Sequence, residues 1–310
     1  MIAIAGPTAV GKTGIALALA ERFDGEIVSV DSVQVYRYMD VGTAKPSREE
    51  LRRVAHHLID ILSPDQEYHV GRFIADAMAA IDGIHARGKV PILAGGTGLY
   101  LDKLMQGICD LPAIDPAIRA EISRRLKLQG GVALHAHLQL VDPASAARLH
   151  PNDRQRICRA LEIFTATGVP WSEHLARQKE GSLAATSLII GLDCPRDLLY
   201  ERIDRRVATM MAAGFEEEVR GLLAMGYGPG LKAMQSIGYR HMCRHLAGDW
   251  TMEQTLAAMA MDTRRYAKRQ LTWFRRVPGI AWFDAARSEP LFRRVEAYLR
   301  HGGRRSLENE

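Results

Sequence analysis

Apolar and polar positions follow two different periods along the first third of the chain. Short apolar runs at residues 1–5, 26–30 and 90–94 predict buried strands, and stretches with helical spacing at 14–22 and 68–85 predict helices between them. Strands separated by helices are typical of a parallel, doubly wound sheet. The chain is therefore predicted to be an α/β protein, with its ligands at the carboxyl ends of the strands.

The pattern changes after this α/β segment. Helical spacing dominates from residue 116 to about 177, and an apolar strand returns at 187–192. We interpret residues 113–185 as a helical insertion domain. The core domain then consists of residues 1–112 and 186–310, and its C-terminal part is predicted to be almost wholly helical beyond the returning strand.

The composition is that of an ordinary globular protein, with 47% hydrophobic and 25% charged residues. The four cysteines form no C-x-x-C pair, which fits a reducing cytosol better than a disulfide framework. The chain opens directly on a predicted core strand, so we expect no signal peptide. Because no apolar stretch approaches the roughly 18 residues that cross a bilayer, we expect a cytoplasmic protein without membrane association.

A glycine-rich loop joins the first predicted strand to the first predicted helix. It has the pattern G-x-x-x-x-G-K-T, and its candidate phosphate-binding residues are Gly6, Thr8, Ala9, Val10, Gly11, Lys12 and Thr13. Backbone N–H groups of such a loop surround an anion, and the positive end of the helix dipole faces it. Lys12 adds a positive charge, and the Thr13 hydroxyl is placed to hold Mg²⁺. The loop predicts a site for a di- or triphosphate.

Asp31 follows the second predicted strand, so it is expected at the same edge of the sheet as the glycine-rich loop. A carboxylate there can hold Mg²⁺ through water, or accept a proton from a nucleophile that lies over the phosphates. Capping of the next turn is the structural alternative. Gly95 and Gly96 stand where motor-type NTPases commonly keep an acidic residue, which weakens the prediction of an ATPase.

The net charge of +5 is modest, but part of it is concentrated near the C-terminus. Residues 263–276 contain no acidic residue and six basic ones, which are Arg264, Arg265, Lys268, Arg269, Arg275 and Arg276. A basic stripe with aromatic residues between the charges is typical of nucleic-acid binding. For the run alone, a solvated helix face is the slightly better explanation.

Two further groups of candidate residues were considered. Arg202 and Arg206 lie one helical turn apart and face the same way, so they can clamp a diphosphate, or pair with acidic neighbours on the surface. The adjacent His56 and His57 point to opposite sides of any regular element, so a histidine metal site is not expected.

Taken together, these segments resemble the tRNA dimethylallyltransferases, also called tRNA isopentenyltransferases. The matching blocks lie at residues 6–13, 31–46, 56–60, 95–100, 153–162, 234–240 and 263–275. They follow the order of the family, and several are more specific than the glycine-rich loop. The resemblance implies a P-loop kinase-like parallel sheet core with a helical insertion.

The resemblance also implies a reaction, which is transfer of a dimethylallyl group from dimethylallyl diphosphate to tRNA. The acceptor would be N6 of the adenosine 3′-adjacent to the anticodon in tRNAs that read codons beginning with U. The loop would then hold the diphosphate leaving group rather than ATP, together with Arg206 and with Mg²⁺ on Thr13. Asp31 would accept a proton from the amine, and the adenine would leave its stack to reach the site.

The same family pattern assigns tRNA contacts along the chain. These residues are Asp31, Ser32, Val33, Gln34, Thr97, Arg119, Gln155, Arg156, Ile157, Cys158, Arg159, Gln235, Ser236, Ile237, Gly238, Tyr239, Arg240, Lys268, Arg269, Gln270, Leu271, Thr272, Trp273, Phe274 and Arg275. With this pattern, phosphate binding becomes the better explanation of the basic stripe.

Two departures from the family pattern are visible. Val10 stands where many relatives carry Ser, a loop position that contacts phosphate mainly through its backbone. The C-terminal zinc-finger extension of eukaryotic relatives is not seen. We therefore expect a bacterial-type enzyme that acts as a monomer without an obligate protein partner.

Three alternatives stay open on the sequence alone. A P-loop small-molecule kinase or NTPase would bind ATP as its nucleotide in the same loop. Adenylate isopentenyltransferase, a close relative, prenylates free AMP and would not need the arginine-rich segments. A non-catalytic RNA-binding protein would use the loop only to sense nucleotide, and Asp31 beside a complete loop argues against it.

Overall fold

The protein is described here by a computed structural model. It describes residues 1–107, 114–176, 183–184 and 186–302. The chain divides into two compact units, of which one consists of Met1–Met105 and Ser182–Glu310 and the other of Gln106–Gly181. We call them the core unit and the insertion unit. The predicted junctions at residues 113 and 185 lie outside the described residues.

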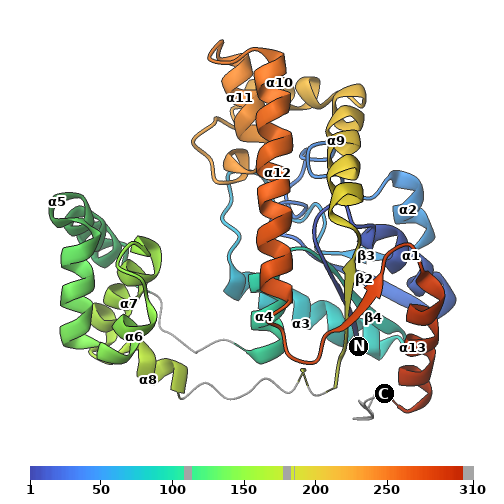
Figure 1. The fold of residues 1–310 in the computed structure, drawn as a ribbon, viewed down its shortest axis with the longest axis horizontal. Coiled ribbons are helices and arrows are strands. Elements are labelled where there is room, and N and C mark those ends of the chain that lie inside the picture. The colour runs from blue at the N-terminus through green and yellow to red at the C-terminus, as the bar shows by residue number, and fades with distance from the viewer. Residues whose placement is uncertain (108–113, 177–182, 185, 303–310) are drawn as a thin grey trace. The chain divides into compact units, whose positions relative to one another are not determined.

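A parallel sheet forms the centre of the core unit (Figure 1). Its strands are β1 (Ile2–Ala5), β2 (Gly25–Val30), β3 (His56–His57), β4 (Val90–Gly95), β5 (Leu188–Asp193) and β6 (Ala281–Asp284). Their order across the sheet is β3-β2-β4-β1-β5-β6, and every adjacent pair is parallel. The predicted α/β class is confirmed, and the carboxyl ends of all these strands meet at one edge.

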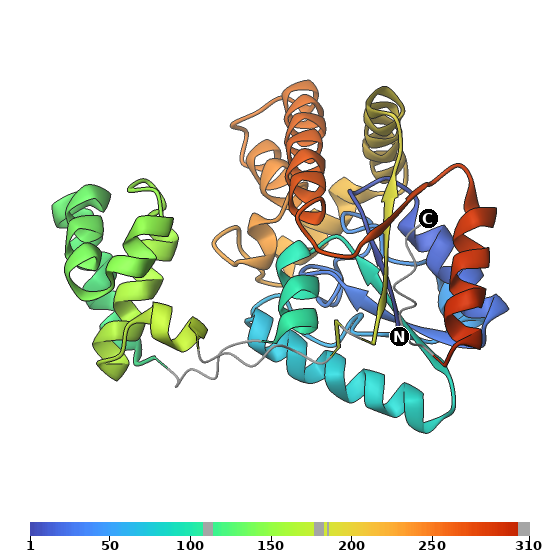
Figure 2. The same ribbon diagram turned by 60° about the horizontal axis from the view of Figure 1, so that its bottom comes forward.

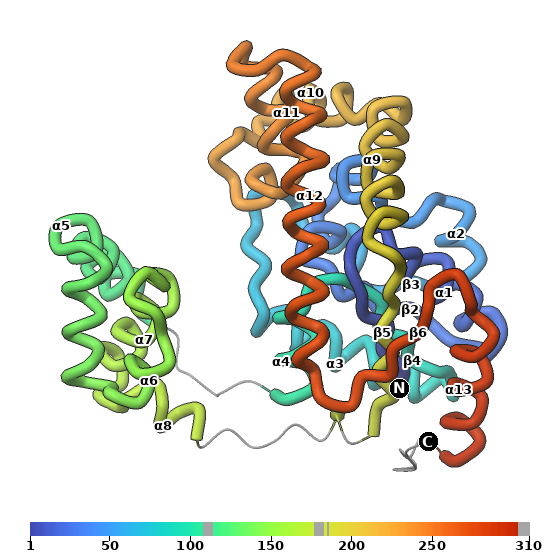
Figure 3. Tube along the Cα trace, viewed as in Figure 1, coloured from blue at the N-terminus to red at the C-terminus, as the bar shows by residue number. Residues whose placement is uncertain are grey.

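The sheet is wider than the sequence predicted. Residues 196 to about 299 were expected to be almost wholly helical, and β6 corrects that expectation. Both β3 and β6 are short edge strands, held by pairing of His56 with Ile27 and of Trp282 with Gly191. Figure 3 shows β5 and β6 side by side although most of the C-terminal helices separate them in the chain. Such pairing is a tertiary effect that a local hydrophobic period does not reveal.

Helices surround the sheet on both faces. Those of the core unit are α1 (Lys12–Arg22), α2 (Arg48–Arg53), α3 (Val70–Ala86), α4 (Gly98–Gln106), α9 (Arg196–Ala212), α10 (Phe215–Ala224), α11 (Tyr239–Leu246), α12 (Met252–Phe274) and α13 (Ser288–Arg300), with a 3₁₀ turn at Ala233–Gln235. Reciprocal capping boxes start α2, through Ser47, and α12, through Thr251. Within the part of the chain that the structure describes, we find no helix with the length and apolar character that a membrane crossing demands.

Alternate residues of the strands face opposite helical layers. Ile2 and Ile4 of β1 pack into a core cluster with side chains of α1, α9 and α13, whereas Ala3 and Ala5 pack into another with α3, α4, α10 and α11. Figures 1 and 2 show α1 and α13 together on one side of the sheet. Since both faces are covered, the strands read as continuous apolar runs, which explains why they were predictable.

The insertion unit is built of helices, as its spacing predicted. They are α5 (Pro116–Val141), α6 (Pro143–Arg148), α7 (Arg154–Thr167) and α8 (Trp171–Ala176). Buried side chains such as Ile122, Leu134 and Ile157 give it a small core of its own. Gly130, with φ of +80°, interrupts α5 with a kink that a glycine accommodates.

Glu26 is a buried carboxylate at the amino end of β2, with 4% of its surface exposed. It accepts two hydrogen bonds from Arg87, at 2.7 and 3.1 Å, and His57 Nε2 lies 2.7 Å from Oε2. The Arg87 hydrogen bond, with a smaller effect of His57 and against the effect of burial, lowers the pKa of Glu26 to about 2. His56 Nδ1 lies 2.8 Å from the Val54 carbonyl oxygen, so both adjacent histidines serve the fold.

Replacing Glu26 with Gln is expected to lower the free energy of unfolding by about 1–2 kcal/mol at pH 7, because an amide cannot accept from Arg87 with both of its terminal atoms. The folded-state pKa lies below the ordinary value of 4.5. The carboxylate therefore stabilises the fold fully above about pH 4.5, and this contribution is lost as the pH falls toward 2. Urea unfolding at pH 7 and at about pH 3.5 measures the difference between wild type and variant, which should be smaller at the lower pH. Glu49→Gln, exposed on α2, is the matched control, and an equal difference at both pH values would contradict this role of Glu26.

Candidate functional site

The glycine-rich loop, residues 6–13, leaves β1 at the carboxyl edge of the sheet and enters α1. Gly6 has φ of +153° and Gly11 has φ of +109°, values that favour glycine. A Cβ on Gly6 would lie 2.8 Å from the Leu192 carbonyl oxygen, so no side chain fits there. The loop is therefore held closely against the end of β5.

Lys12 spans this loop from within. Its Nζ donates to the carbonyl oxygens of Gly6, at 3.0 Å, and Pro7, at 2.7 Å. Burial and then the charge of Arg206 lower the pKa of Lys12 to about 7, while Asp31 opposes the shift. The ammonium group is thus poised between its charged and neutral forms, and an anion above the loop would favour the charged form.

A cavity of about 240 Å³, which we call the loop pocket, lies against the loop. The predicted phosphate-binding residues that line it are Thr8, Ala9, Gly11, Lys12, Thr13 and Arg206. Gly6 and Val10 are not among its lining residues. The side chain of Val10 is fully buried in the core, which explains how an apolar residue is accommodated at this position.

The two candidate arginines on α9, Arg202 and Arg206, have different tasks. Arg202 donates from Nη1 to the Val10 carbonyl oxygen at 3.0 Å, and so holds the backbone of the loop. Arg206, one turn later, lines the loop pocket and donates from Nη2 to the Thr43 carbonyl oxygen at 3.3 Å. Burial lowers the pKa of Arg206, against the effect of Asp31. The structure thus separates a residue that supports the loop from one that can reach an anion.

Asp31 follows β2 directly and lines the loop pocket. Its Oδ1 accepts hydrogen bonds from the N–H groups of Val33, at 2.8 Å, and Gln34, at 3.1 Å. The capping role considered for this residue is therefore real. These contacts occupy Oδ1 and fix the plane of the carboxyl group, so that Oδ2 is the oxygen that a substrate would reach.

A second cavity of about 350 Å³, the side pocket, lies next to the loop pocket. The residues that line both cavities are Thr8, Asp31, Thr43, Arg206 and Tyr266. Elsewhere the side pocket combines apolar side chains such as Ile203, Met210 and Met259 with the polar Thr263 and Arg240. The predicted base thus stands at the boundary between a cationic pocket and a larger, more apolar one.

Tyr266 is a boundary residue that the sequence analysis missed. Burial and then the charge of Asp31 raise the pKa of its hydroxyl to about 12, so the group is protonated at neutral pH and can donate a hydrogen bond. On α12, four of the pocket-lining residues, Met259, Thr263, Tyr266 and Gln270, recur at intervals of three and four. This helical period is the signal that reveals them, and the basic residues between them obscured it.

Three predicted RNA contacts need correction. Gln270 is buried, accepts from the Thr8 N–H at 2.8 Å and donates to the Gly96 carbonyl oxygen at 2.9 Å. Ile157 and Phe274 have 0% of their surfaces exposed. The side chain of Ile157 packs in the core of the insertion unit, and that of Phe274 packs in the core unit. Gln270 ties α12 to the glycine-rich loop.

The remaining predicted residues fall into separate groups. Those that line the side pocket are Ser32, Val33, Ser236, Ile237, Gly238, Tyr239, Arg240 and Arg269, and Gln34 lines the loop pocket. Gln235 instead donates to the Pro229 carbonyl oxygen. The Thr97 hydroxyl is buried beside the site and interacts with the Tyr266 hydroxyl, which partly offsets the rise in the pKa of that tyrosine.

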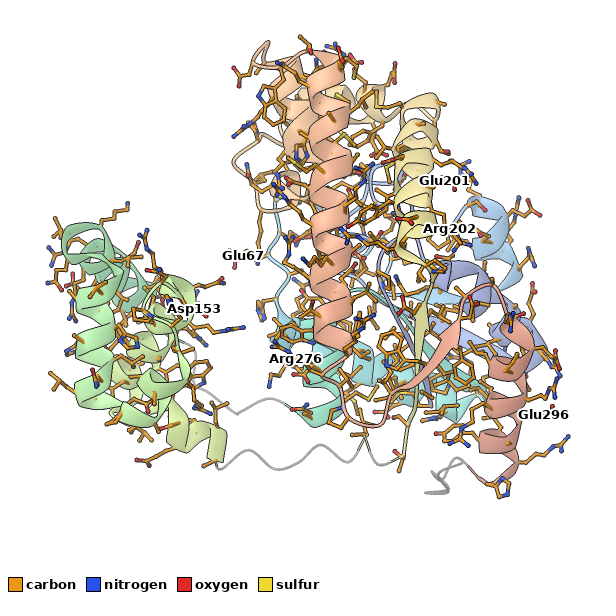
Figure 4. All side chains as sticks on the ribbon, viewed as in Figure 1. Glu67, Asp153, Glu201, Arg202, Arg276 and Glu296 are labelled. Atoms are coloured by element: carbon orange, nitrogen blue, oxygen red, sulfur yellow. The ribbon has the colours of Figure 1, made fainter. Side chains whose placement is uncertain are left out.

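On the surface, the exposed predicted contacts of the core unit are Lys268, Arg269, Thr272 and Arg275, whereas Leu271 and Trp273 are half-buried. Figure 4 shows Arg276 at the C-terminal end of α12. In the insertion unit, Arg119, Gln155 and Arg156 are exposed, and Cys158 and Arg159 are half-buried. The basic stripe is thus partly a real exposed surface and partly the buried face of α12.

The donor set of the loop pocket fits a magnesium ion. Thr13 contributes a hydroxyl, which is a hard oxygen ligand. Mg²⁺ commonly takes one or two oxygens from the protein and the rest from phosphates and water. No group of three or more His, Cys, Asp or Glu that would suit another metal is found among the residues that the structure describes.

A family model and several known proteins match most of this chain. A model described as IPP transferase matches residues 34–277. The tRNA dimethylallyltransferases of Syntrophobacter fumaroxidans and Geobacter sulfurreducens are each 50% identical to this chain, over 295 and 284 residues. These alignments cover 95% and 92% of this chain, and 86% and 91% of those proteins.

Two solved structures are also similar. The tRNA isopentenylpyrophosphate transferase from Bacillus halodurans is 40% identical, with a TM-score of 0.70 over 97% of this chain and 95% of that one. A eukaryotic dimethylallyltransferase, described as acting on tRNA, has a TM-score of 0.85 at 29% identity, over 100% of this chain and 81% of that chain.

The lowered pKa of Lys12 predicts a proton linkage. The pKa of about 7 should rise when a diphosphate adds negative charge to the loop pocket. At pH 8 the wild-type protein is therefore expected to take up as much as about one proton when pyrophosphate binds. Calorimetry in two buffers of different ionisation enthalpy measures this uptake. Lys12→Arg, which stays charged, is the matched control for protons taken up by pyrophosphate itself, and equal uptake by both proteins would rule out Lys12.

Proposed function

The chain belongs to the IPP transferase family of tRNA dimethylallyltransferases, and we propose that it uses dimethylallyl diphosphate as its donor. It is an enzyme, a prenyl transferase that acts in tRNA modification. The proposed acceptor is N6 of the adenosine 3′-adjacent to the anticodon, in tRNAs that read codons beginning with U. Diphosphate is the second product.

One observation carries the proposal, which is the shared boundary of the two pockets. A displacement at carbon needs the leaving group on one side of that carbon and the nucleophile on the other. Asp31, Arg206 and Tyr266 line both cavities, so charged and donor groups meet where the carbon would pass. The diphosphate is assigned to the loop pocket, and the dimethylallyl group with the adenine to the side pocket.

The bonds change as follows in the proposed reaction. The N6 lone pair forms a bond to the first carbon of the dimethylallyl group. The bond between that carbon and the diphosphate oxygen breaks, and its electron pair leaves with the diphosphate. Asp31 accepts the proton that N6 loses, and its hydrogen bonds from Val33 and Gln34 keep the carboxylate oriented for this task.

The leaving group needs positive charge and hydrogen-bond donors. Lys12 and Arg206 would neutralise the charge that grows on the departing oxygen, and the hydroxyl of Tyr266 would add a donor. Mg²⁺, held by Thr13 and the diphosphate itself, would supply further charge stabilisation when bound.

The acceptor is proposed to be tRNA rather than free AMP. Lys268, Arg275 and Arg276 are exposed, close in sequence to pocket-lining residues of α12, and phosphate groups beyond the reacting nucleoside would pair with them. Arg119 and Arg156 extend the proposal to the insertion unit.

The assignment of Asp31 is tested by transfer of label. Protein incubated with Mg²⁺, radiolabelled dimethylallyl diphosphate and unmodified tRNA is expected to label the adenosine next to the anticodon and to leave AMP unlabelled. Asp31→Asn should lower kcat by about 10²- to 10⁴-fold, because the proton acceptor is lost, while the tRNA dissociation constant stays within a few-fold. Asp65→Asn, which is exposed, is the control. Wild-type turnover by Asp31→Asn would remove the base, and label in AMP alone would replace the acceptor.

The exposed part of the basic stripe predicts a salt dependence. The double variant Lys268→Ala, Arg276→Ala should weaken tRNA binding and reduce the slope of log K against log salt by about one to two, since fewer counterions are released. Filter binding across a salt series measures the slope. Arg293→Ala with Arg300→Ala, on α13, removes the same charge elsewhere and should leave the slope unchanged. An unchanged slope in the α12 variant would return its basic face to a solvated helix surface.

A further inference from the structure

The side chain of Glu218, on α10, holds the backbone of residues 40–42, which belong to a turn that borders both pockets. Its carboxylate accepts hydrogen bonds from the N–H groups of Asp40, at 2.8 Å, Val41, at 2.6 Å, and Gly42, at 3.1 Å. A fourth hydrogen bond comes from the Tyr239 hydroxyl at 2.6 Å. Because hydrogen bonds to a charged acceptor are roughly twice as strong as neutral ones, one side chain fixes three successive residues. We call residues 40–43 the clamped turn.

Gly42 of the clamped turn is also packed closely against α10 and α11. A Cβ on Gly42 would lie 2.2 Å from Cε2 of Phe215 and 2.6 Å from Cε2 of Tyr239, so no side chain fits. Tyr239 has 0% of its surface exposed, and burial together with Glu218 raises the pKa of its hydroxyl. The hydroxyl therefore stays protonated and remains a donor to the carboxylate.

The opposite side of the same turn faces the proposed reaction site. Its last carbonyl oxygen, that of Thr43, accepts from Arg206 Nη2 at 3.3 Å. It also accepts from Gln34 Nε2 at 3.3 Å, and the Gln34 N–H donates to Asp31. Thr43 and Gly42 line the side pocket. A displacement of the turn would thus reach the anion-binding guanidinium and the carboxyl group of the proposed base.

We propose that Glu218 is a positioning residue for the transfer reaction. By fixing the clamped turn, it holds the Thr43 carbonyl oxygen where that oxygen orients Arg206 into the loop pocket. The proposal rests on the proposed function, because it concerns the geometry of a diphosphate ligand. In this proposal Glu218 contacts no substrate and acts only by holding the clamped turn.

Glu218→Gln is the direct test, because an amide of the same shape presents an NH₂ group to backbone N–H donors. Its dissociation constant for pyrophosphate and its KM for dimethylallyl diphosphate are expected to rise about tenfold or more, as a loss of charge-assisted hydrogen bonds implies. The melting temperature should stay within a few degrees, and the tRNA dissociation constant within about twofold. Glu217→Gln, the exposed neighbour on α10, is the matched control and should bind pyrophosphate as the wild type does.

A double-mutant cycle with Arg206→Ala separates positioning from general stabilisation. If Glu218 acts through Arg206, the double variant binds pyrophosphate no more weakly than Arg206→Ala alone. Effects that multiply, or a Glu218→Gln protein with wild-type affinity, would overturn the proposal. If Glu218→Gln does not fold, Glu218→Asp, which keeps the charge but shortens the reach, enters the same cycle with the same criteria.

Failure of the proposed function would look different. In that case the wild-type protein itself would not bind pyrophosphate, or would not label tRNA from dimethylallyl diphosphate. A wild type that does both, with a cycle that shows independent effects, would leave the proposed function intact and reject the role of Glu218.

Discussion

Close approach of strand ends is the constraint on which the site depends. Ala5 of β1 pairs with Gly95 on one side and with Gly191 on the other, so the glycine-rich loop leaves the sheet between two residues without side chains. A Cβ on Gly95 would lie 2.1 Å from the Val30 carbonyl oxygen, which means that β2 and β4 nearly touch where Asp31 begins. The carboxylate therefore comes to the loop because small residues let the backbones converge.

The long helix α12 lines the pockets with one face and carries exposed basic residues on the other, whereas the sequence shows only a basic stripe. Its inner face lines both pockets and ends in Gln270, which joins the loop at Thr8 to the turn at Gly96. Its outer face carries the exposed cations, and Arg264 is anchored to Asp204 of α9 through two hydrogen bonds, at 2.5 and 2.6 Å. The outer face of α12 is thereby connected to the loop through one continuous helix.

The sequence revealed those parts of the fold whose cause is local. The loop at residues 6–13, the buried strands and the place of Asp31 at the end of the second strand follow from the sequence pattern, and the family resemblance added the role of Asp31 as proton acceptor. Strand β6, the supporting role of Arg202 and the boundary position of Tyr266 were not found, because each depends on partners that are distant in the chain. A family pattern lists positions without saying which side chains are buried. It therefore counted Gln270 among RNA contacts although the fold uses both ends of its amide.

The common wall of the two cavities has a thermodynamic consequence. Five side chains face both spaces, so a molecule that fills one changes the surface and the field that the other presents. Under the proposed assignment of donor and acceptor to these cavities, their affinities would be coupled, and reciprocity requires such a coupling to be equal in both directions. A donor that tightens binding of the acceptor by some factor would then be bound more tightly by the same factor when the acceptor is present.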